Sequence, residues 1–262
     1  FELTSSNDGT NDNNTYVAWC WKAGGAGVSN SDGSITSTVS ANTEAGFSIV
    51  TYTGTGSSAT VGHGLDEAPQ VVITKTRSSN DHWAVYHHDI GNGKIVYLNL
   101  TNTPATSSNY WNNTSPTSTV FSIGSDNKTG KNGDNYVAYC WHEIPGFSKF
   151  GQYSGNNAND GTFIFTGFRP AWLMVKRTDS TRDWLIYDSA RSTFNPIQDF
   201  LEPNQTTAEQ SANANKVDFV ANGFKFRNNS GDMNGAGTYI YFAYAEQSGD
   251  TVFKDQVFPN AR

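Results

Sequence analysis

Three consecutive residues, His87, His88 and Asp89, first suggest chemistry, because imidazole nitrogens and carboxylates are common metal ligands. Adjacent side chains of a strand point to opposite faces, so the two imidazoles would not easily reach one ion. A similar strand later in the chain carries Asp188 and Ser189 instead of the two histidines. The pattern therefore favours a polar strand end, and no metal site is predicted.

Paired carboxylates would indicate glycoside hydrolysis, which needs two carboxyl groups about 5–10 Å apart. The candidates outside linkers are Asp81, Asp89, Asp179, Asp183, Asp188, Glu143 and Glu246. Three of them, Asp81, Asp179 and Asp183, lie in turn-like segments, where Asp has a local structural role. The sequence also lacks a Gly-x-Ser-x-Gly motif, a phosphate loop and zinc-ligand spacing. We therefore expect no enzyme and no catalytic residue.

Loops rich in Asp and Asn, such as SDNKTGKNGDN, offer carboxylate and carbonyl oxygens that suit calcium. None of these loops has the regular spacing of an EF-hand, so calcium binding is left open and no cofactor is predicted. His63, between two glycines in VGHGL, indicates a tight turn.

A binding site for sugars is the remaining candidate. Tyr110 and Trp111 lie in SSNYWNNTSPT, a polar stretch without a strand pattern, and Asn112 and Asn113 follow them. Exposed aromatic faces can stack on sugar rings, and amides can bind hydroxyls. The alternative is a loop whose aromatic residues fold back onto the protein core.

Composition narrows the class of protein. The chain has 262 residues, of which 36% are hydrophobic and 16% charged, and its net charge is −7. Nucleic-acid binding needs clustered Lys and Arg, and the basic residues are scattered here, so nucleic acid is not expected as a partner. No apolar run approaches the ~20 residues of a membrane-spanning helix, so we expect no membrane insertion.

The chain repeats itself with a period of about 100 residues. Four residue pairs share an offset of 101: Pro69 and Pro170, Lys75 and Lys176, Trp83 and Trp184, Tyr86 and Tyr187. Phe121 with Phe224 and Tyr136 with Tyr239 follow at an offset of 103. YVAWCW at Tyr16–Trp21 also matches YVAYCW at Tyr136–Trp141. The expected organisation has five parts: the last strands of a partial repeat (1–21), a linker (22–44), two full repeats (45–145 and 146–248) and a tail (249–262).

The repeated segments are short apolar runs separated by Gly, Asn, Ser and Asp, which is typical of β-strands and turns. The sequence therefore predicts an all-β fold of tandem, jelly-roll-like β-sandwiches. Residues 206–216 are the one plausible helix, and the short junction Ile144-Pro145-Gly146 predicts that the repeats pack together. Both cysteines are expected to be reduced and buried. The expected core includes Tyr16, Cys20, Trp83, Tyr86, Tyr136, Cys140, Trp184, Tyr187 and Tyr239.

The repeated YVA[W/Y]CW strand, the VGHGL turn, the W-x-x-Y strand and YLNLTN…SSNYWNNTSPTSTVF resemble a known family. It is the uncharacterised C-terminal repeat domain of large virion proteins of tailed phages, especially marine ones. The resemblance covers nearly all of residues 1–248. It implies a tail-fibre or adhesion protein in the virion tail, outside the host cell. Its implied partners are other virion tail proteins and a bacterial surface glycan or receptor, but it carries over no functional residue.

Assembly follows from the partial repeat at the start. The apolar segment Val17–Trp21 must dock on another sheet, in its own chain or in a neighbour. Phage fibres favour the second solution, so we expect a homo-oligomer, with a trimer as the first choice. The alternative functions are a glycan depolymerase of a phage tail and a secreted bacterial adhesin or filament subunit.

Overall fold

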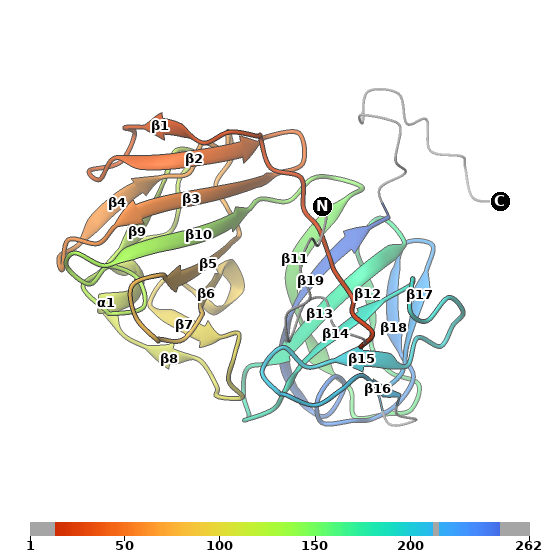
Figure 1. Ribbon diagram of the computed structural model, residues 1–262. Coiled ribbons are helices and arrows are strands. Elements are labelled where there is room, and N and C mark those ends of the chain that lie inside the picture. Colours follow the sequence, from red (N-terminus) through yellow and green to blue (C-terminus); the bar gives the residue numbers. More distant parts are fainter. Residues whose placement is uncertain (1–13, 212–214, 247–262) are drawn as a thin grey trace.

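The computed structural model of the protein describes residues 14–211 and 215–246. Strands make up nearly all of the regular structure in these residues, and they form two large and two small sheets. The predicted all-β sandwich fold is therefore confirmed. Figure 1 shows the large sheets side by side, with the chain running from the first (red to green) into the second (green to blue).

The first large sheet has eight antiparallel strands in the order β1-β2-β3-β10-β5-β6-β7-β8. They are β1 (Val28–Asn30), β2 (Ser37–Asn42), β3 (Phe47–Thr53), β5 (Val71–Thr76), β6 (Ala84–His87), β7 (Lys94–Tyr97), β8 (Ala105–Thr106) and β10 (Asn135–Trp141). A small sheet of β4 (Ala59–Gly62) and β9 (Val120–Ile123), with the one-turn helix α1 (Ser108–Trp111), packs on one face. We call β1 to β10 the first unit.

The second large sheet has six antiparallel strands in the order β11-β19-β13-β14-β15-β16. They are β11 (Ser148–Gly155), β13 (Pro170–Arg177), β14 (Trp184–Asp188), β15 (Asp199–Leu201), β16 (Gln210–Ser211) and β19 (Gly237–Ala245). A three-stranded sheet of β12 (Phe163–Phe165), β18 (Gly223–Phe226) and β17 (Val217–Val220) covers one face. We call β11 to β19 the second unit.

The two large sheets follow the same path along the chain. In the first unit β10 pairs with β3 and β5, and in the second unit β19 pairs with β11 and β13. A tyrosine of β3 stacks on one of β10, and a tyrosine of β11 stacks on one of β19. The ring centroids lie 5.2 Å apart for Tyr52 and Tyr136 and 4.9 Å apart for Tyr153 and Tyr239.

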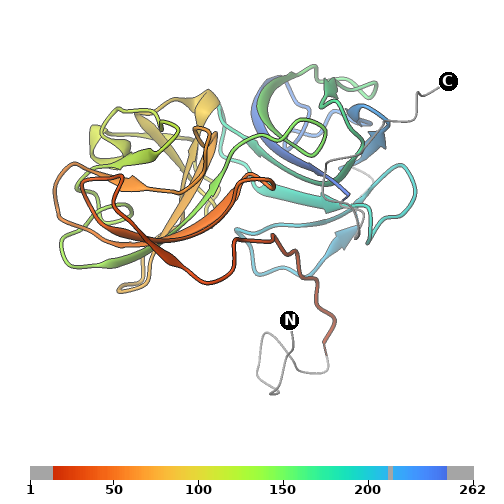
Figure 2. The same cartoon turned by 90° about the horizontal axis from the view of Figure 1, so that it is seen from above.

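A third apolar core joins the units through the outer faces of the large sheets. Alternate residues of a strand serve the two faces, so in β10 Cys140 points into the first sandwich and Trp141 toward the second unit. The junction Ile144-Pro145-Gly146 turns sharply, and Gly146 has φ 79°, a conformation that favours glycine. The packing expected from this short junction is present, and Figure 2 shows the two units in contact from above.

A fully buried lysine also connects the units. The Nζ of Lys176 donates hydrogen bonds to the carbonyl oxygens of Thr101, Arg177 and Arg182, at 2.8–3.0 Å. Thr101 belongs to the first unit, and the other residues belong to the second. Burial lowers the pKa of Lys176 to about 8. Because three carbonyl oxygens solvate its ammonium group, this residue has a structural role at the contact.

The expected linker is wrong as a description of residues 22–44. This segment forms β1 and β2, which extend the first large sheet beyond β3. Pairing through the backbone needs no apolar run, and only Val39 of β2 enters the core. The expected helix at 206–216 is also wrong where the structure describes it, because Gln210–Ser211 is strand β16. Residues 1–13 and the expected tail at 249–262 lie outside the described residues.

The partial repeat at the start forms no strand over residues 14–21. Tyr16 is 44% exposed and Cys20 is exposed, so neither belongs to the core as predicted. Both cysteines are free, and Cys140 is fully buried, where desolvation raises the pKa of its thiol. The other predicted core residues lie inside, with Trp83 half-buried: Tyr86, Tyr136, Trp184, Tyr187 and Tyr239.

Candidate functional site

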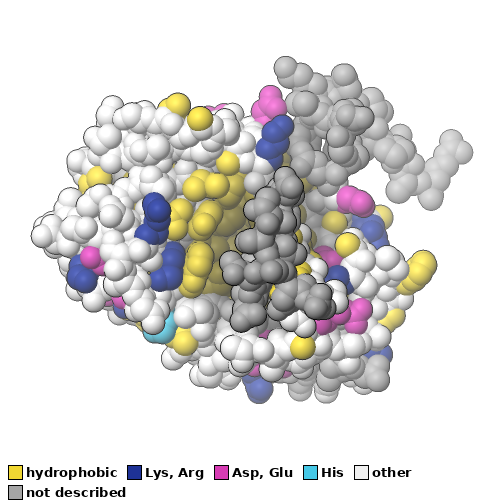
Figure 3. All heavy atoms as spheres, in the orientation of Figure 1, with side chains coloured by type: hydrophobic (Ala, Val, Ile, Leu, Met, Phe, Trp, Pro, Cys, Tyr) yellow, Lys and Arg dark blue, Asp and Glu magenta, His cyan; other side chains and the backbone are white. Residues whose placement is uncertain are grey.

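An apolar groove lies between the two large sheets. It encloses a cavity of about 360 Å³, and Figure 3 shows it as the yellow depression between the units. We call it the inter-sheet groove. Its lining residues are Trp19, Trp21, Phe47, Ile49, Ile73, Trp83, Leu98, Tyr139, Trp141, Trp172, Met174, Ile186, Pro203, Phe242 and Tyr244.

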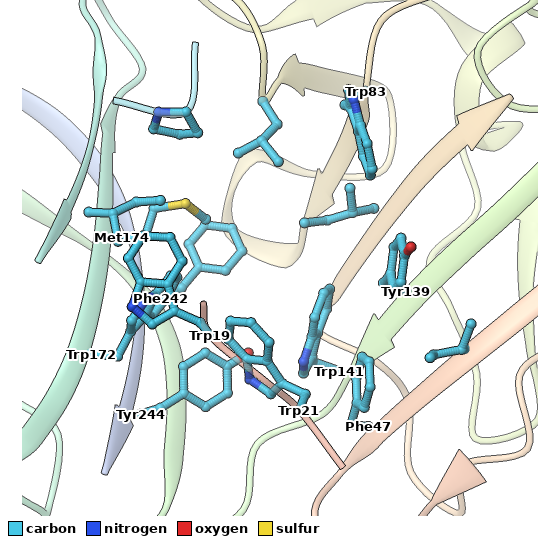
Figure 4. Close-up of a pocket in the computed structure, with 15 residues that line it drawn as sticks. Trp19, Trp21, Phe47, Trp83, Tyr139, Trp141, Trp172, Met174, Phe242 and Tyr244 are labelled. Carbon is cyan, nitrogen blue, oxygen red and sulfur yellow. The ribbon is translucent and has the colours of Figure 1, made fainter. Parts of the chain in front are cut away.

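The groove exists because both large sheets have apolar outer faces. Tyr139 and Trp141 come from β10, whereas Phe242 and Tyr244 occupy the corresponding strand β19 of the second unit. Figure 4 shows these two sets of rings facing one another, with Trp19 and Trp21 near the second set. A wall of aromatic rings on each side suits ligands with flat or apolar faces.

Residues 14–23, which we call the strap, cross this groove in extended form. Their alternate residues Trp19 and Trp21 are half-buried, whereas Cys20 between them is exposed. Trp19 donates its indole N–H to Asp188 Oδ2 at 3.1 Å, and the Arg191 guanidinium lies 5.7 Å from its ring centroid. The strap is thereby attached to the second unit.

Trp21 contacts both sides of the groove. Its ring lies edge-to-face with Trp141 of the first unit, with centroids 6.1 Å apart. It makes similar contacts with Trp172 at 5.6 Å and with Tyr244 at 5.5 Å in the second unit. One strap residue therefore bridges the two sheets.

Two indole groups of the groove lack a hydrogen-bond acceptor among the described residues. The Nε1 atoms of Trp141 and Trp172 are both buried and unpaired. By contrast, Trp184 donates its indole N–H to the carbonyl oxygen of Tyr97 at 2.9 Å. A buried donor without an acceptor is costly, so these two indoles are unsatisfied polar groups within the aromatic walls.

The groove has no acid–base chemistry of its own. Its described lining residues include no Asp, Glu, Lys, Arg or His. Arg191 Nε and Asp188 Oδ2 lie 2.6 Å apart, and both contact Trp19 of the lining. The aromatic walls suit the binding of ligands with flat or apolar faces.

The predicted sugar-binding pair lies elsewhere and is not exposed. Tyr110 is 8% exposed and Trp111 is 2% exposed, within the core of the first unit. Trp111 donates its indole N–H to the carbonyl oxygen of Lys94 at 3.0 Å. The interpretation of an open aromatic surface is therefore wrong. Ser107 caps the one-turn helix α1, and this turn directs both rings inward.

The amides that follow this pair do remain at the surface. Asn112 and Asn113 are exposed and have left-handed backbone conformations, with φ 51° and 48°. Asn112 accepts a hydrogen bond from the Ser58 hydroxyl at 2.9 Å. Without an exposed ring beside them, these amides form an ordinary turn surface.

His87, His88 and Asp89 do come together, since their candidate ligand atoms lie within 4.8 Å of one another. The imidazoles of both histidines nevertheless form hydrogen bonds with backbone groups. His87 Nδ1 accepts from the Asp89 N–H at 3.3 Å, and its Nε2 lies 3.4 Å from the Tyr241 carbonyl oxygen. The Nε2 of His88 lies 3.2 Å from the carbonyl oxygen of Phe150. The imidazoles therefore hold the first unit against β11 and β19.

The electrostatics of this cluster agree with that role. Burial, with a smaller contribution from His88, lowers the pKa of His87 to about 3. Burial also raises the pKa of Asp89 despite the nearby His88. Glu143 lies nearby and accepts the Phe150 N–H at 2.8 Å, while Lys149 Nζ is 3.6 Å from its other oxygen. These polar groups hold the junction between the units.

His63 is fully buried, and the turn around it is held by the imidazole. Its Nδ1 accepts from the Leu65 N–H at 3.1 Å, and its Nε2 lies 3.0 Å from the Thr117 carbonyl oxygen. Gly64 beside it has φ 70°. Both ring nitrogens are thus engaged within the first unit.

A comparison with known families found one family model that matches residues 1–248, which is nearly the whole chain. The chain belongs to this family. Its description is "domain of unknown function (DUF7483)". No curated protein and no solved structure matches the chain. Among the described residues of this family member, no helix is long and apolar enough to cross a membrane.

Sequence reasoning missed the groove as a site. The signal was present in β10 and β19, the last strands of the two units, whose two faces are both apolar, as in YVAYCW. One face fills the sandwich, so the other must meet a second apolar surface. Which surface it meets depends on how the units pack, and a single strand pattern does not contain that information.

Proposed function

We propose that this chain is a non-catalytic structural and binding module of a phage virion, in a tail fibre or a related adhesion protein. The resemblance of the repeated strands to virion proteins of tailed phages supports the location. The inter-sheet groove supports the activity, because it joins aromatic walls with two unpaired indole donors. Its ligand in this proposal is a bacterial surface glycan.

The groove suits a glycan in two respects. Sugar rings have apolar faces that stack on aromatic side chains, and a ligand that parts the walls would bring its hydroxyl oxygens to the buried N–H groups of Trp141 and Trp172. Figure 3 shows part of the groove as a yellow hollow at the surface. The absence of charged side chains from its described lining suits a neutral polysaccharide better than an acidic one.

We further propose that the two units are copies of one repeat of about 100 residues. The shared strand order, the stacked tyrosine pairs and the matching bonds of Trp83 and Trp184 support this. The backbone N–H of Trp83 donates to Asn99 Oδ1, and that of Trp184 donates to Asn204 Oδ1. Repeats in series fit a fibre, where each unit adds length and contacts its neighbours.

Oligomerisation remains part of the proposal. Trp19 and Trp21 of the strap dock within their own chain, so burial of these two rings needs no neighbouring chain. A trimer therefore rests on the resemblance to phage fibres alone. Several weak glycan sites on one assembly would still raise the overall affinity.

Calorimetric titration with purified surface polysaccharides of candidate host bacteria tests the binding. Replacing Trp141 or Trp172 with Phe removes the indole N–H and keeps an aromatic ring. We expect each change to weaken binding by about three- to ten-fold, the value of one hydrogen bond. Trp111→Phe is the matched control, because its N–H is bound to Lys94, and it should leave the affinity unchanged.

Equal binding by all three variants would place the glycan outside the groove. A protein that binds no polysaccharide from any host tested would contradict the glycan-binding proposal. Release of oligosaccharides would instead indicate the depolymerase alternative, with Asp89 and Glu143 as the first carboxyl groups to replace.

A further inference from the structure

The short strand β12 has an unused edge. It pairs only with β18 among the described strands, with Phe163 opposite Lys225, Ile164 opposite Phe224 and Phe165 opposite Gly223. Ile164 is buried in the core of the second unit. Phe163 and Phe165 are 45% and 60% exposed, so two large apolar rings stand side by side at the edge.

The hydrogen bonds around β12 show which backbone groups are free. The Phe226 N–H donates to the Thr162 carbonyl oxygen, and the Thr166 N–H donates to the Asn222 carbonyl oxygen. Bonded and non-bonded pairs alternate in an antiparallel ladder. Phe163 and Phe165 therefore direct their N–H and C=O groups away from β18, toward the open edge.

The corresponding edge in the first unit is covered. Val61 of β4 is opposite Phe121 of β9, as Ile164 is opposite Phe224, with an offset of 103 residues in both positions. On the outer side of β4, the Ile35 N–H donates to the Thr60 carbonyl oxygen at 3.0 Å. Ser37 Oγ donates to the Gly62 carbonyl oxygen at 2.8 Å.

The covering segment has no counterpart in the second unit. It belongs to the stretch before β3, whereas only residues 142–147 separate β10 from β11. Among the described residues, no strand pairs with this edge of β12. At the two positions where β4 has Thr60 and Gly62, β12 has Phe163 and Phe165.

The sequence around this edge is self-complementary. Residues 161–167 read GTFIFTG, the same in both directions about Ile164. In an antiparallel pair of two such strands with the two-fold axis at Ile164, each Phe163 lies opposite the Phe165 of the second copy. Their free N–H and C=O groups then form four hydrogen bonds, and the four rings gather on one face.

We propose that β12 is the contact through which a second copy of this chain binds, by antiparallel β12–β12 pairing about Ile164. The contact is isologous and closes as a dimer. It joins the three-stranded sheets of two copies into one six-stranded sheet and buries Phe163 and Phe165. This contact lies in the β12-β18-β17 sheet, separate from the inter-sheet groove, so the dimer and the glycan proposal can fail independently.

Light scattering coupled to gel filtration, from low to high micromolar concentration, tests the contact. We expect the mass to rise from the 28.5 kDa of one chain to twice that value. Phe163→Lys and Phe165→Lys should each abolish the dimer. Both rings are already exposed, so the variants should keep the fold, which circular dichroism checks. Phe194→Lys is the matched control, because Phe194 is 85% exposed on a loop outside β12.

Hydrogen exchange gives a second measure that needs no variant. The amides of Phe163 and Phe165 should become protected as the concentration rises, whereas those of the exposed loop at Phe194 should not. A single-chain mass at all concentrations, a three-fold mass, or a dimer that survives both Phe→Lys changes would overturn the proposal.

Discussion

The neighbouring residues His87 and His88 differ in their exposure to solvent. His87 is fully buried between the units, and His88 is partly exposed. Their adjacency in the sequence suggested opposite faces of a strand, and β6 in fact ends at His87. His88 begins the short 3-10 helix His88–Ile90, which brings both rings back toward Asp89. The alternation of side chains between the two faces of a strand stops where the strand ends, so it does not apply to His88.

The buried imidazole of His87 predicts a loss of stability in mild acid. Its pKa is about 3 in the folded protein, against about 6.5 when unfolded. Between pH 6.5 and pH 3 the imidazole is therefore protonated in the unfolded chain but neutral in the folded chain. The free energy of unfolding falls as the pH falls through this range. From pH 7 to pH 5 this residue alone should cost about 2 kcal/mol.

Urea unfolding of the wild type and of His87→Gln at pH 7 and pH 5 measures this contribution. Gln keeps a donor and an acceptor but does not titrate, so the variant should lose less stability between the two pH values. The buried His63, whose pKa is also lowered by desolvation, remains in both proteins. Equal losses in the two proteins would mean that His87 is not the group responsible.

At the scale of elements, the strands that could be recognised from the sequence are those that fill a core. β5, β10, β13 and β19 have apolar residues on both faces, and their runs are visible without any structure. β1 and β2 were missed because they are polar and are held by backbone pairing. The strap is the opposite case. Its sequence predicts a strand, but no described strand pairs with it.

The strap is expected to contribute to stability through Trp21. This half-buried ring bridges Trp141 on one sheet and Tyr244 on the other. Trp21→Ala should lower the free energy of unfolding by about 2 kcal/mol, from the apolar area and ring contacts that it loses. Val17→Ala on the same segment is the control, because Val17 is 38% exposed, and it should change stability by less than about 0.5 kcal/mol.

Thermal and urea unfolding of both strap variants give these values. A Trp21→Ala protein as stable as the wild type would show that the strap does not stay on the groove in solution.

At the scale of the whole molecule, the sequence predicted two sandwich units and their contact but not the surface between them. The repeat offsets and the short junction were sufficient for the first two. The groove depends on residues from six strands, from three loops and from the strap, which meet only when the units pack. Tyr110 and Trp111 were predicted to form a surface site because their sequence neighbours are polar, but both side chains are buried in the core.

If the two units are copies of one repeat, equivalent changes should have similar effects. The Tyr52 hydroxyl donates to the Thr129 carbonyl oxygen, and the Tyr153 hydroxyl donates to the Met233 carbonyl oxygen, both at 2.7 Å. Tyr52→Phe and Tyr153→Phe each remove one buried hydrogen bond. Each should therefore destabilise the protein by about 1–2 kcal/mol.

Denaturant unfolding of the two single variants and of the double variant measures this. The single effects should agree within about 0.5 kcal/mol and add in the double variant, because the sites are in separate cores. An effect in one unit without a comparable effect in the other would contradict the equivalence of the two tyrosine pairs.

The arrangement of indoles in the groove also has an optical consequence. Five of the seven tryptophans of the chain line this one surface: Trp19, Trp21, Trp83, Trp141 and Trp172. Their rings lie close enough to exchange excitation energy, so the intrinsic fluorescence of the protein comes largely from a single place. A change of colour or intensity in that emission is therefore a direct signal that the strap has moved or that the groove has been filled.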